Sequence, residues 1–256
     1  MKKIFFNTSE FHKNGFVVIK NVISKTLIKN FEKDIKTTYL HLNKKKKYKK
    51  ENFASFFKSY PRRKELYKLM QNMSIVKEIL GHVDKIFGKS NVYKKLKFKI
   101  PSYNTSLIMS VPKEEMFVLP PHQDHGDFYS KNIFKIWLPM TQVDEKFGSF
   151  KLYTGSHKKG LYDHEFITKS HTAEVKRKYL LKYKTKIIKS KPGALIIFNP
   201  MIVHQSIKNI SKQMRFIITS QFQNITSLEK KPSKFLLKMS KIERARANAR
   251  KKLNFN

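Results

Sequence analysis

The sequence predicts a mainly β protein, an antiparallel sandwich or barrel flanked by helices from the N-terminal third and the C-terminus. From about residue 92 onward, short apolar runs alternate with turn residues, mostly proline and glycine. Before that point, apolar residues recur at helical spacing instead. We interpret the 256 residues as one domain with a helical part (1–90), a β core (92–225) and a basic C-terminal helix (228–256). The runs predicted as strands are SLIMSV (106–111), FKIWLP (134–139), SFKLY (149–153), TKIIK (185–189), ALIIF (194–198) and MRFIITSQF (214–222).

The N-terminal third is predicted to hold two helical regions. Ser24 is the expected N-cap of the first, because four apolar residues follow it at helical spacing. These residues are Leu27, Ile28, Phe31 and Ile35. The second region covers residues 60 to 87. Between the two, NKKKKYKKEN (43–52) is interpreted as a basic surface loop, with a phosphate- or nucleic-acid-binding patch as the alternative.

The C-terminal stretch from Leu228 to Asn256 is predicted to form a basic helix with one apolar stripe. This stretch contains ten basic and only two acidic residues, and four apolar residues recur at helical spacing. The stripe consists of Phe235, Leu236, Met239 and Ile242. We expect it to pack on the β core, with peripheral contact to an anionic membrane as the alternative.

Composition excludes several kinds of chemistry. The chain has no cysteine, which rules out disulfides, thiolate zinc sites, iron–sulfur clusters and a cysteine nucleophile. Any metal must therefore bind nitrogen and oxygen. Polar residues interrupt the apolar N-terminal run before a signal-peptide core forms, and no stretch approaches the length of a transmembrane helix. These observations predict a cytoplasmic protein.

The net charge is strongly positive. Lysine and arginine number 55 and acidic residues 18, for a formal charge of +37. Such a field favours anionic partners, including carboxylated or phosphorylated small molecules, nucleic acid and membrane surfaces. The lysines are scattered over the whole chain and do not alternate with aromatic residues along a strand, which disfavours nucleic acid.

The stretch PPHQDHGDF (120–128) predicts a metal site. Side chains alternate across an extended backbone, so His122 and Asp124 point to one face and His125 to the other. A third candidate ligand is His204, which follows the apolar run ALIIF and lies 82 residues after His122. Two histidines and one carboxylate match the facial triad of non-haem Fe(II) oxygenases. A zinc or nickel site in a cupin-like protein without oxidative chemistry is the alternative.

Arg215 favours the oxygenase. It lies eleven residues after His204, at the start of a predicted inward-facing strand. A buried arginine is costly unless it meets a carboxylate, and its planar guanidinium suits a bidentate one. The distal carboxylate of 2-oxoglutarate would meet that need, whereas a non-oxidative metal protein leaves Arg215 unexplained.

Four segments, in order, resemble the phytanoyl-CoA dioxygenase-like family of Fe(II)/2-oxoglutarate oxygenases. They are EFHKNGFVVIKNVIS (10–24), PPHQD (120–124), FKIWLPMTQVDEKFGSFKLYTGSHKKG (134–160) and KPGALIIFNPMIVHQSIKNISKQMRFIIT (191–219). The resemblance implies a double-stranded β-helix, the cupin-like jelly roll. It also implies a dioxygenase that uses O2 to hydroxylate a C–H bond of a small substrate, releasing succinate and CO2. The positive charge favours an anionic or carrier-linked substrate.

The resemblance assigns roles to individual residues. It implies that His122, Asp124 and His204 bind Fe(II), and that Arg215 with Ser206 holds the far carboxylate of 2-oxoglutarate. Trp137 and Gln123 would lie beside that cosubstrate. The chain departs from the family pattern in two places. On the strand before the metal motif, where the family often has a lysine, it offers Ser110 or no side chain at all, and Pro121 replaces the tryptophan of the metal motif. A carboxylate at Asp124 favours hydroxylation over halogenation, and binding to nucleic acid or an anionic surface remains the alternative function.

Overall fold

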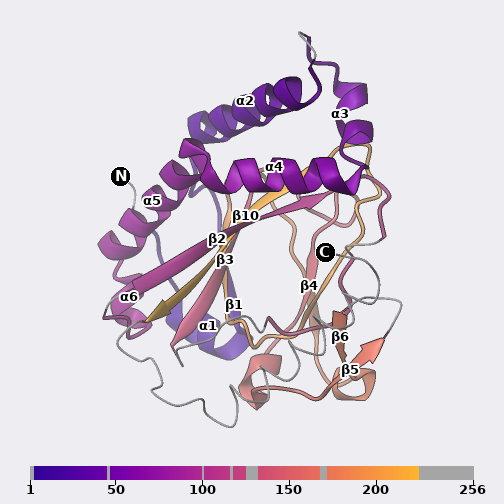
Figure 1. Cartoon of the computed structure of the whole chain (residues 1–256). Coiled ribbons are helices and arrows are strands. Elements are labelled where there is room, and N and C mark those ends of the chain that lie inside the picture. Colours follow the sequence, from indigo (N-terminus) through magenta and orange to yellow (C-terminus); the bar gives the residue numbers. More distant parts are fainter. Residues whose placement is uncertain are drawn as a thin grey trace.

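The computed structural model describes residues 3–44, 47–99, 101–115, 118–124, 132–167 and 172–224 (Figure 1). The predicted helix at 228–256 and His125 lie outside these ranges. The helices are α1 (Thr8–Asn14), α2 (Lys25–Leu42), α3 (Lys50–Phe56), α4 (Tyr60–Asn72), α5 (Ser74–Lys89) and α6 (Val92–Lys95), with short 3-10 helices η1 (Ser156–Lys159) and η2 (Arg177–Tyr179). The strands are β1 (Phe16–Ile19), β2 (Pro101–Ser110), β3 (Ile133–Pro139), β4 (Phe150–Tyr153), β5 (His164–Ile167), β6 (Thr172–Val175), β7 (Thr185–Ile187), β8 (Leu195–Phe198), β9 (His204–Ser206) and β10 (Arg215–Asn224).

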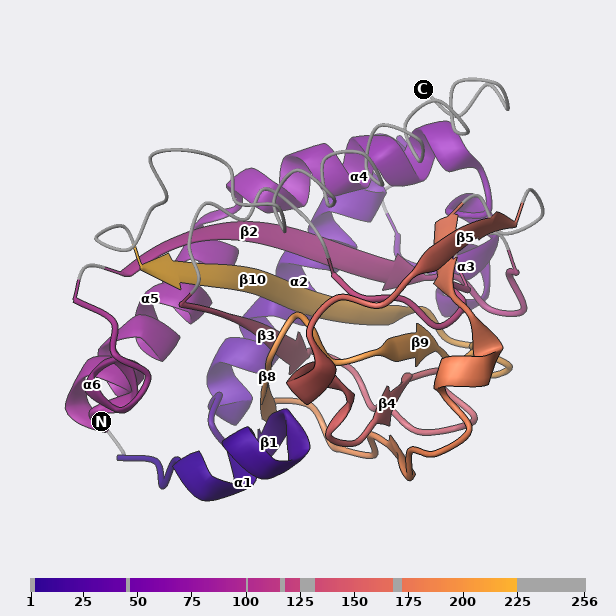
Figure 2. The ribbon, with the colours of Figure 1, turned by 90° about the horizontal axis from the view of Figure 1, so that it is seen from below.

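The strands form antiparallel sheets, as predicted. Within the described ranges, a large sheet has the order β1-β8-β3-β10-β2, a small sheet has the order β7-β4-β9, and β5 pairs with β6. Figure 2 shows β2, β10 and β3 side by side, with β4 and β9 set apart from them. This is the jelly-roll arrangement with flanking helices. All six predicted runs contain a strand, whereas the polar β5–β6 hairpin was not predicted.

The N-terminal segment forms a helix, a glycine turn and a strand. The Asn7 side chain caps α1 by accepting a hydrogen bond from the backbone N–H of Glu10. Gly15 ends the helix at φ 87°, a left-handed conformation in which its N–H donates to the carbonyl of Phe11. The strand that follows, β1, pairs with β8 at the edge of the large sheet. The helical N-terminal part therefore contributes one strand to the β core.

The helices follow the predicted pattern with two differences. Ser24 caps α2 as expected, with its Oγ accepting from the N–H of Leu27 at 3.2 Å. The region predicted at 60–87 is two helices, because Met73 leaves the helical conformation between α4 and α5. The basic loop predicted at 43–52 is wrong at its end, since α3 begins at Lys50. Three apolar residues near that helix pack around Tyr39, which explains the early start. They are Phe53, Phe56 and Phe57.

The two faces of the large sheet pack differently. One face carries residues such as Phe134 and Phe216, which lie 5.6 Å and 6.1 Å, centroid to centroid, from Phe87 and Phe31 of the helices. Figure 1 shows α2, α4 and α5 gathered on one side of the molecule. The opposite face meets the small sheet, with the Trp137 ring 4.4 Å from Phe150. Strand alternation places Arg215 and Trp137 on this inner face.

Candidate metal centre

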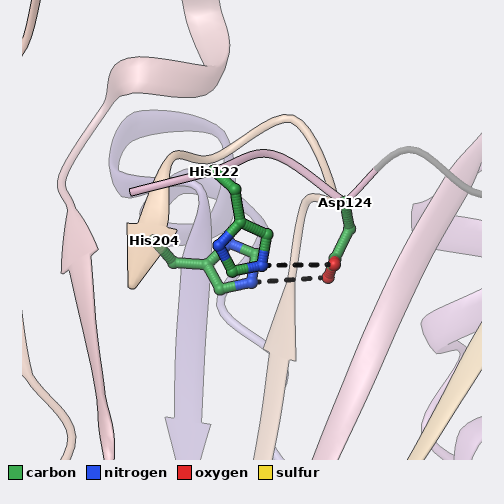
Figure 3. Close-up of side chains that lie close together, drawn as sticks. All are labelled: His122, Asp124 and His204. Atoms are coloured by element: carbon green, nitrogen blue, oxygen red, sulfur yellow. Dashed lines mark ion pairs between the residues drawn. The ribbon is translucent and has the colours of Figure 1, made fainter. Parts of the chain in front are cut away.

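Three side chains converge between the sheets. The ligand atoms of His122, Asp124 and His204 all lie within 4.8 Å of one another. Both histidines are buried and Asp124 is half-buried. Figure 3 shows the two imidazole rings side by side, with their edges directed at the carboxylate. The structure thus brings together the three residues that the sequence predicted as ligands.

Backbone pairing holds the two ligand segments in place. His122 and His204 form an isolated antiparallel bridge, with N–H to carbonyl distances of 2.8 and 2.9 Å. The N–H of Asp124 donates to the carbonyl of Pro200 at 3.0 Å. Because both segments are hydrogen-bonded to each other, residues 82 positions apart hold a fixed relative geometry.

The ring orientation of each histidine suits a metal ligand. The Nδ1 of His122 lies 2.7 Å from the carbonyl of Pro120, and the Nδ1 of His204 lies 3.1 Å from the carbonyl of Ile202. A carbonyl can only accept, so each Nδ1 carries the proton and each Nε2 presents a lone pair. These Nε2 atoms lie 3.8 and 3.5 Å from the oxygens of Asp124. Two neutral imidazoles and a carboxylate fit an octahedral divalent metal with nitrogen and oxygen ligands.

Electrostatics keep Asp124 ionised. Burial alone would raise its pKa, but the positive charge of Lys135, with a contribution from each histidine when it is protonated, outweighs burial and holds the pKa well below its usual range. The Nζ of Lys135 lies 2.8 Å from Oδ2 of Asp124. Burial also lowers the pKa of His204, which favours the neutral imidazole that a metal requires. Lys135 was not predicted as a site residue. The only indication in the sequence is that a charged residue interrupts an apolar strand two residues before Trp137.

A buried guanidinium lies farther along the same inner face. Arg215 is 6% exposed, and no carboxylate in the described ranges is ion-paired with it. Its Nη1 donates to the carbonyl of Ser149 at 3.3 Å, and its Cζ lies 5.9 Å from the Trp137 ring centroid. Its Nε has no hydrogen-bond partner among the described residues. Burial lowers the pKa of Arg215 to about 10, so the group stays charged at neutral pH.

Comparison with known proteins identifies the family. Residues 11–217 match the family model described as phytanoyl-CoA dioxygenase (PhyH). The chain belongs to this family. No curated protein sequence matches the chain.

Several solved structures share the fold at low sequence identity. One is the α-ketoglutarate-dependent carbocyclase SnoK of nogalamycin biosynthesis, 13% identical, with a TM-score of 0.57 over 85% of this chain and 82% of SnoK. Another is the apo non-haem monooxygenase ThoJ, 15% identical, with a TM-score of 0.57 over 96% of both chains. A third is EvdO2 from Micromonospora carbonacea var. aurantiaca complexed with 2-oxoglutarate, 12% identical, with a TM-score of 0.53 over 87% and 93%. These likenesses establish the fold.

Trp137, Ser206 and Gln123 are the other residues predicted to lie near the cosubstrate, and each has different neighbours. Trp137 lies beside Arg215, and Ser206 follows His204 by two residues on β9 and so shares its face. Gln123 is fully buried. Its amide donates to the carbonyls of Gly160 and Met201 and accepts from the N–H of Tyr162. These hydrogen bonds connect the segment that carries His122 and Asp124 to two other loops. That Gln123 lies beside the cosubstrate stays a prediction.

No helix in the described ranges is long and apolar enough to cross a bilayer.

Proposed function

We propose that this PhyH-family chain is an Fe(II)- and 2-oxoglutarate-dependent dioxygenase that hydroxylates a C–H bond of a small-molecule substrate. The observation that carries the proposal is the pairing of two features in one interior. The triad of His122, Asp124 and His204 suits Fe(II), and Arg215 is a buried cation without an ion-paired carboxylate among the described residues. A dicarboxylate that chelates the metal at one end and meets a guanidinium at the other satisfies both. The fold neighbour EvdO2 has been solved with 2-oxoglutarate.

Each residue has a distinct task in this proposal. His122, Asp124 and His204 would hold the metal, leaving three coordination positions for the cosubstrate and oxygen. Arg215 would bind the distal carboxylate through charge-assisted hydrogen bonds. When bound, Fe(II) with 2-oxoglutarate and O2 supplies the oxidising chemistry, in which 2-oxoglutarate becomes succinate and CO2 while one oxygen atom enters the substrate.

Aromatic side chains pack against one of the histidines of the triad. The rings of Phe150 and Phe198 lie 5.9 and 5.5 Å from the His204 ring and meet it at steep angles. Both belong to an apolar cluster between the two sheets. A dry interior strengthens the electrostatic interactions of the metal ligands and protects reactive species from side reactions.

Asp124 bears on the reaction type. A carboxylate ligand at this position fills the coordination place that a halide would otherwise take, so we favour hydroxylation over halogenation. The fold neighbours include a carbocyclase and a monooxygenase, so the fold does not by itself select the outcome.

The proposal is tested by iron-dependent turnover of 2-oxoglutarate. We expect one Fe(II) per chain and slow formation of succinate even without the primary substrate. Asp124→Ala should lower iron affinity by at least about 100-fold and abolish succinate formation. Asp34→Ala, which removes an aspartate from helix α2, is the matched control and should behave as wild type. Full turnover by Asp124→Ala, or iron binding without 2-oxoglutarate consumption by the wild type, would exclude this function.

A further inference from the structure

Lys135 is a charged side chain on the inner face of the large sheet. On β3 it is paired with Gln221 of β10 and Phe198 of β8, and it shares a face with Trp137. Its side chain is 19% exposed, and its Nζ lies 2.8 Å from Asp124. An ammonium group in such a place is costly unless an anion accompanies it. In the structure, that anion is the metal-binding carboxylate.

A bound metal changes this arrangement. Asp124 would then direct its charge to a divalent cation, which repels the ammonium group of Lys135. Across the loaded site, a divalent metal and Arg215 bring three positive charges, and Asp124 and 2-oxoglutarate bring three negative ones. Among the charges of the described residues, Lys135 is then left without compensation beside the metal.

We propose that Lys135 forms an anion subsite next to the metal and that the primary substrate carries a carboxylate, phosphate or sulfate group that binds it. The inference rests on the proposed function and names its substrate class. Arg215 and Lys135 then have separate tasks. The pairing with β10 places Lys135 opposite Gln221, six residues beyond Arg215 on the same face of the sheet. The cosubstrate would therefore bind Arg215, and the substrate would bind Lys135.

The neighbouring side chains are also suited to a polar substrate. Gln221 lies opposite Lys135, and Gln223 shares its face of β10 two residues farther on. The Oε1 atom of Gln223 is buried and has no hydrogen-bond partner in the part of the chain that the structure describes. An unsatisfied buried acceptor is unfavourable, so a hydroxyl or amine donor on the substrate would stabilise it. The substrate class is therefore a small polar anion with hydrogen-bond donors.

The test uses the full chain loaded with Mn(II) and 2-oxoglutarate, with inorganic phosphate and acetate as probe anions. Mn(II) is paramagnetic, so an anion bound beside it shows faster nuclear relaxation. We expect saturable enhancement for at least one probe with the wild type, and a dissociation constant at least about tenfold higher for Lys135→Met. Lys135→Arg keeps the charge and should retain binding. The control is Lys151→Met, on the outer face of β4, which should bind as the wild type does.

The outcomes separate this inference from the proposed function. If Lys135→Met binds the probes as tightly as the wild type, or if the wild type binds neither probe, there is no anion subsite. If Lys135→Met instead loses Mn(II) affinity with probe binding intact, Lys135 serves only to position Asp124, and the inference is wrong. In each of these cases the loaded wild type still binds Mn(II) and 2-oxoglutarate. Failure to bind them would refute the proposed function itself, and this inference with it.

Discussion

Two buried arginines in the described ranges have opposite environments. Arg63 of α4 is 5% exposed and is ion-paired with Glu114, in the loop that follows β2. Arg215 of β10 is 6% exposed and has no ion-paired carboxylate in the described ranges. Burying a guanidinium without a counter-ion is unfavourable. Arg63 joins a helix to a loop, whereas in the proposed function Arg215 would be compensated by the distal carboxylate of 2-oxoglutarate.

The local geometry around Arg215 supports this difference. Gly148 approaches the guanidinium so closely that a Cβ atom there would lie 3.0 Å from Nη1. The Trp137 ring centroid lies 5.9 Å from Cζ of Arg215, and the carbonyl of Ser149 accepts one hydrogen bond. The group is therefore held in one orientation before any ligand arrives, which reduces the entropic cost of binding.

Replacing each arginine by methionine should have opposite effects on stability. Arg63→Met leaves Glu114 without its counter-charge, and we expect a loss of about 3 kcal/mol in the free energy of unfolding, because the Glu114 side chain is 17% exposed and water reaches part of it. Arg215→Met removes an uncompensated charge, so the ligand-free protein should be as stable as wild type or more so. Urea unfolding of the ligand-free variants measures both. An equal loss at the two positions would mean that Arg215 has a partner within the chain.

Lysine substitutions sharpen the comparison, because they keep the charge and remove the planar fork. Arg215→Lys should weaken 2-oxoglutarate binding by about 10- to 100-fold, equivalent to 1.5–3 kcal/mol for a charge-assisted hydrogen bond. Arg63→Lys should leave 2-oxoglutarate affinity unchanged. Calorimetric titration of the metal-loaded variants distinguishes the two, and an unaltered affinity in Arg215→Lys would assign that arginine a purely structural role.

Gly148→Ala tests the space around the guanidinium. Gly148 and Gly155 have nearly equal positive φ angles, 78° and 79°, so alanine at either position should cost about 1 kcal/mol of stability from backbone strain. Only at Gly148 would the new methyl group meet Nη1 of Arg215, as well as the carbonyl of Ile207 at 2.9 Å. We therefore expect a several-fold loss of 2-oxoglutarate affinity in Gly148→Ala and none in Gly155→Ala. Similar affinities in both variants would show that the guanidinium can move freely.

Lowering the pH should act on the metal ligands and leave Arg215 unaffected. A pKa of about 10 keeps Arg215 charged throughout the acid range. Burial lowers the pKa of His204 below 6.5, so its Nε2 remains unprotonated and available to metal until the pH falls below that value. Metal affinity should change by less than about tenfold between pH 8 and 6.5 and then fall steeply. A steep fall beginning above pH 6.5 would show that burial does not lower this pKa.

Sequence patterns predicted the features that depend on neighbouring residues in the chain. Apolar runs marked six of the ten strands in the described ranges, the Ser24 cap marked α2, and strand alternation put His122 and Asp124 on one face. Contacts that depend on register between distant segments were not predicted. Lys135 reaches Asp124 only because β3 lies next to β8 and β10, and the partner of Arg63 comes from a loop 51 residues away. No single-strand pattern contains that information.

Anaerobic titration of the Fe(II)-loaded protein with 2-oxoglutarate tests the central claim most directly. The account predicts one 2-oxoglutarate per chain in the wild type and in Arg63→Lys, and no saturable binding in Arg215→Met at concentrations that saturate the wild type. Iron content, measured in parallel, should be equal in all three proteins, because Arg215 does not touch the metal ligands. Binding of 2-oxoglutarate by Arg215→Met with wild-type affinity would contradict the account.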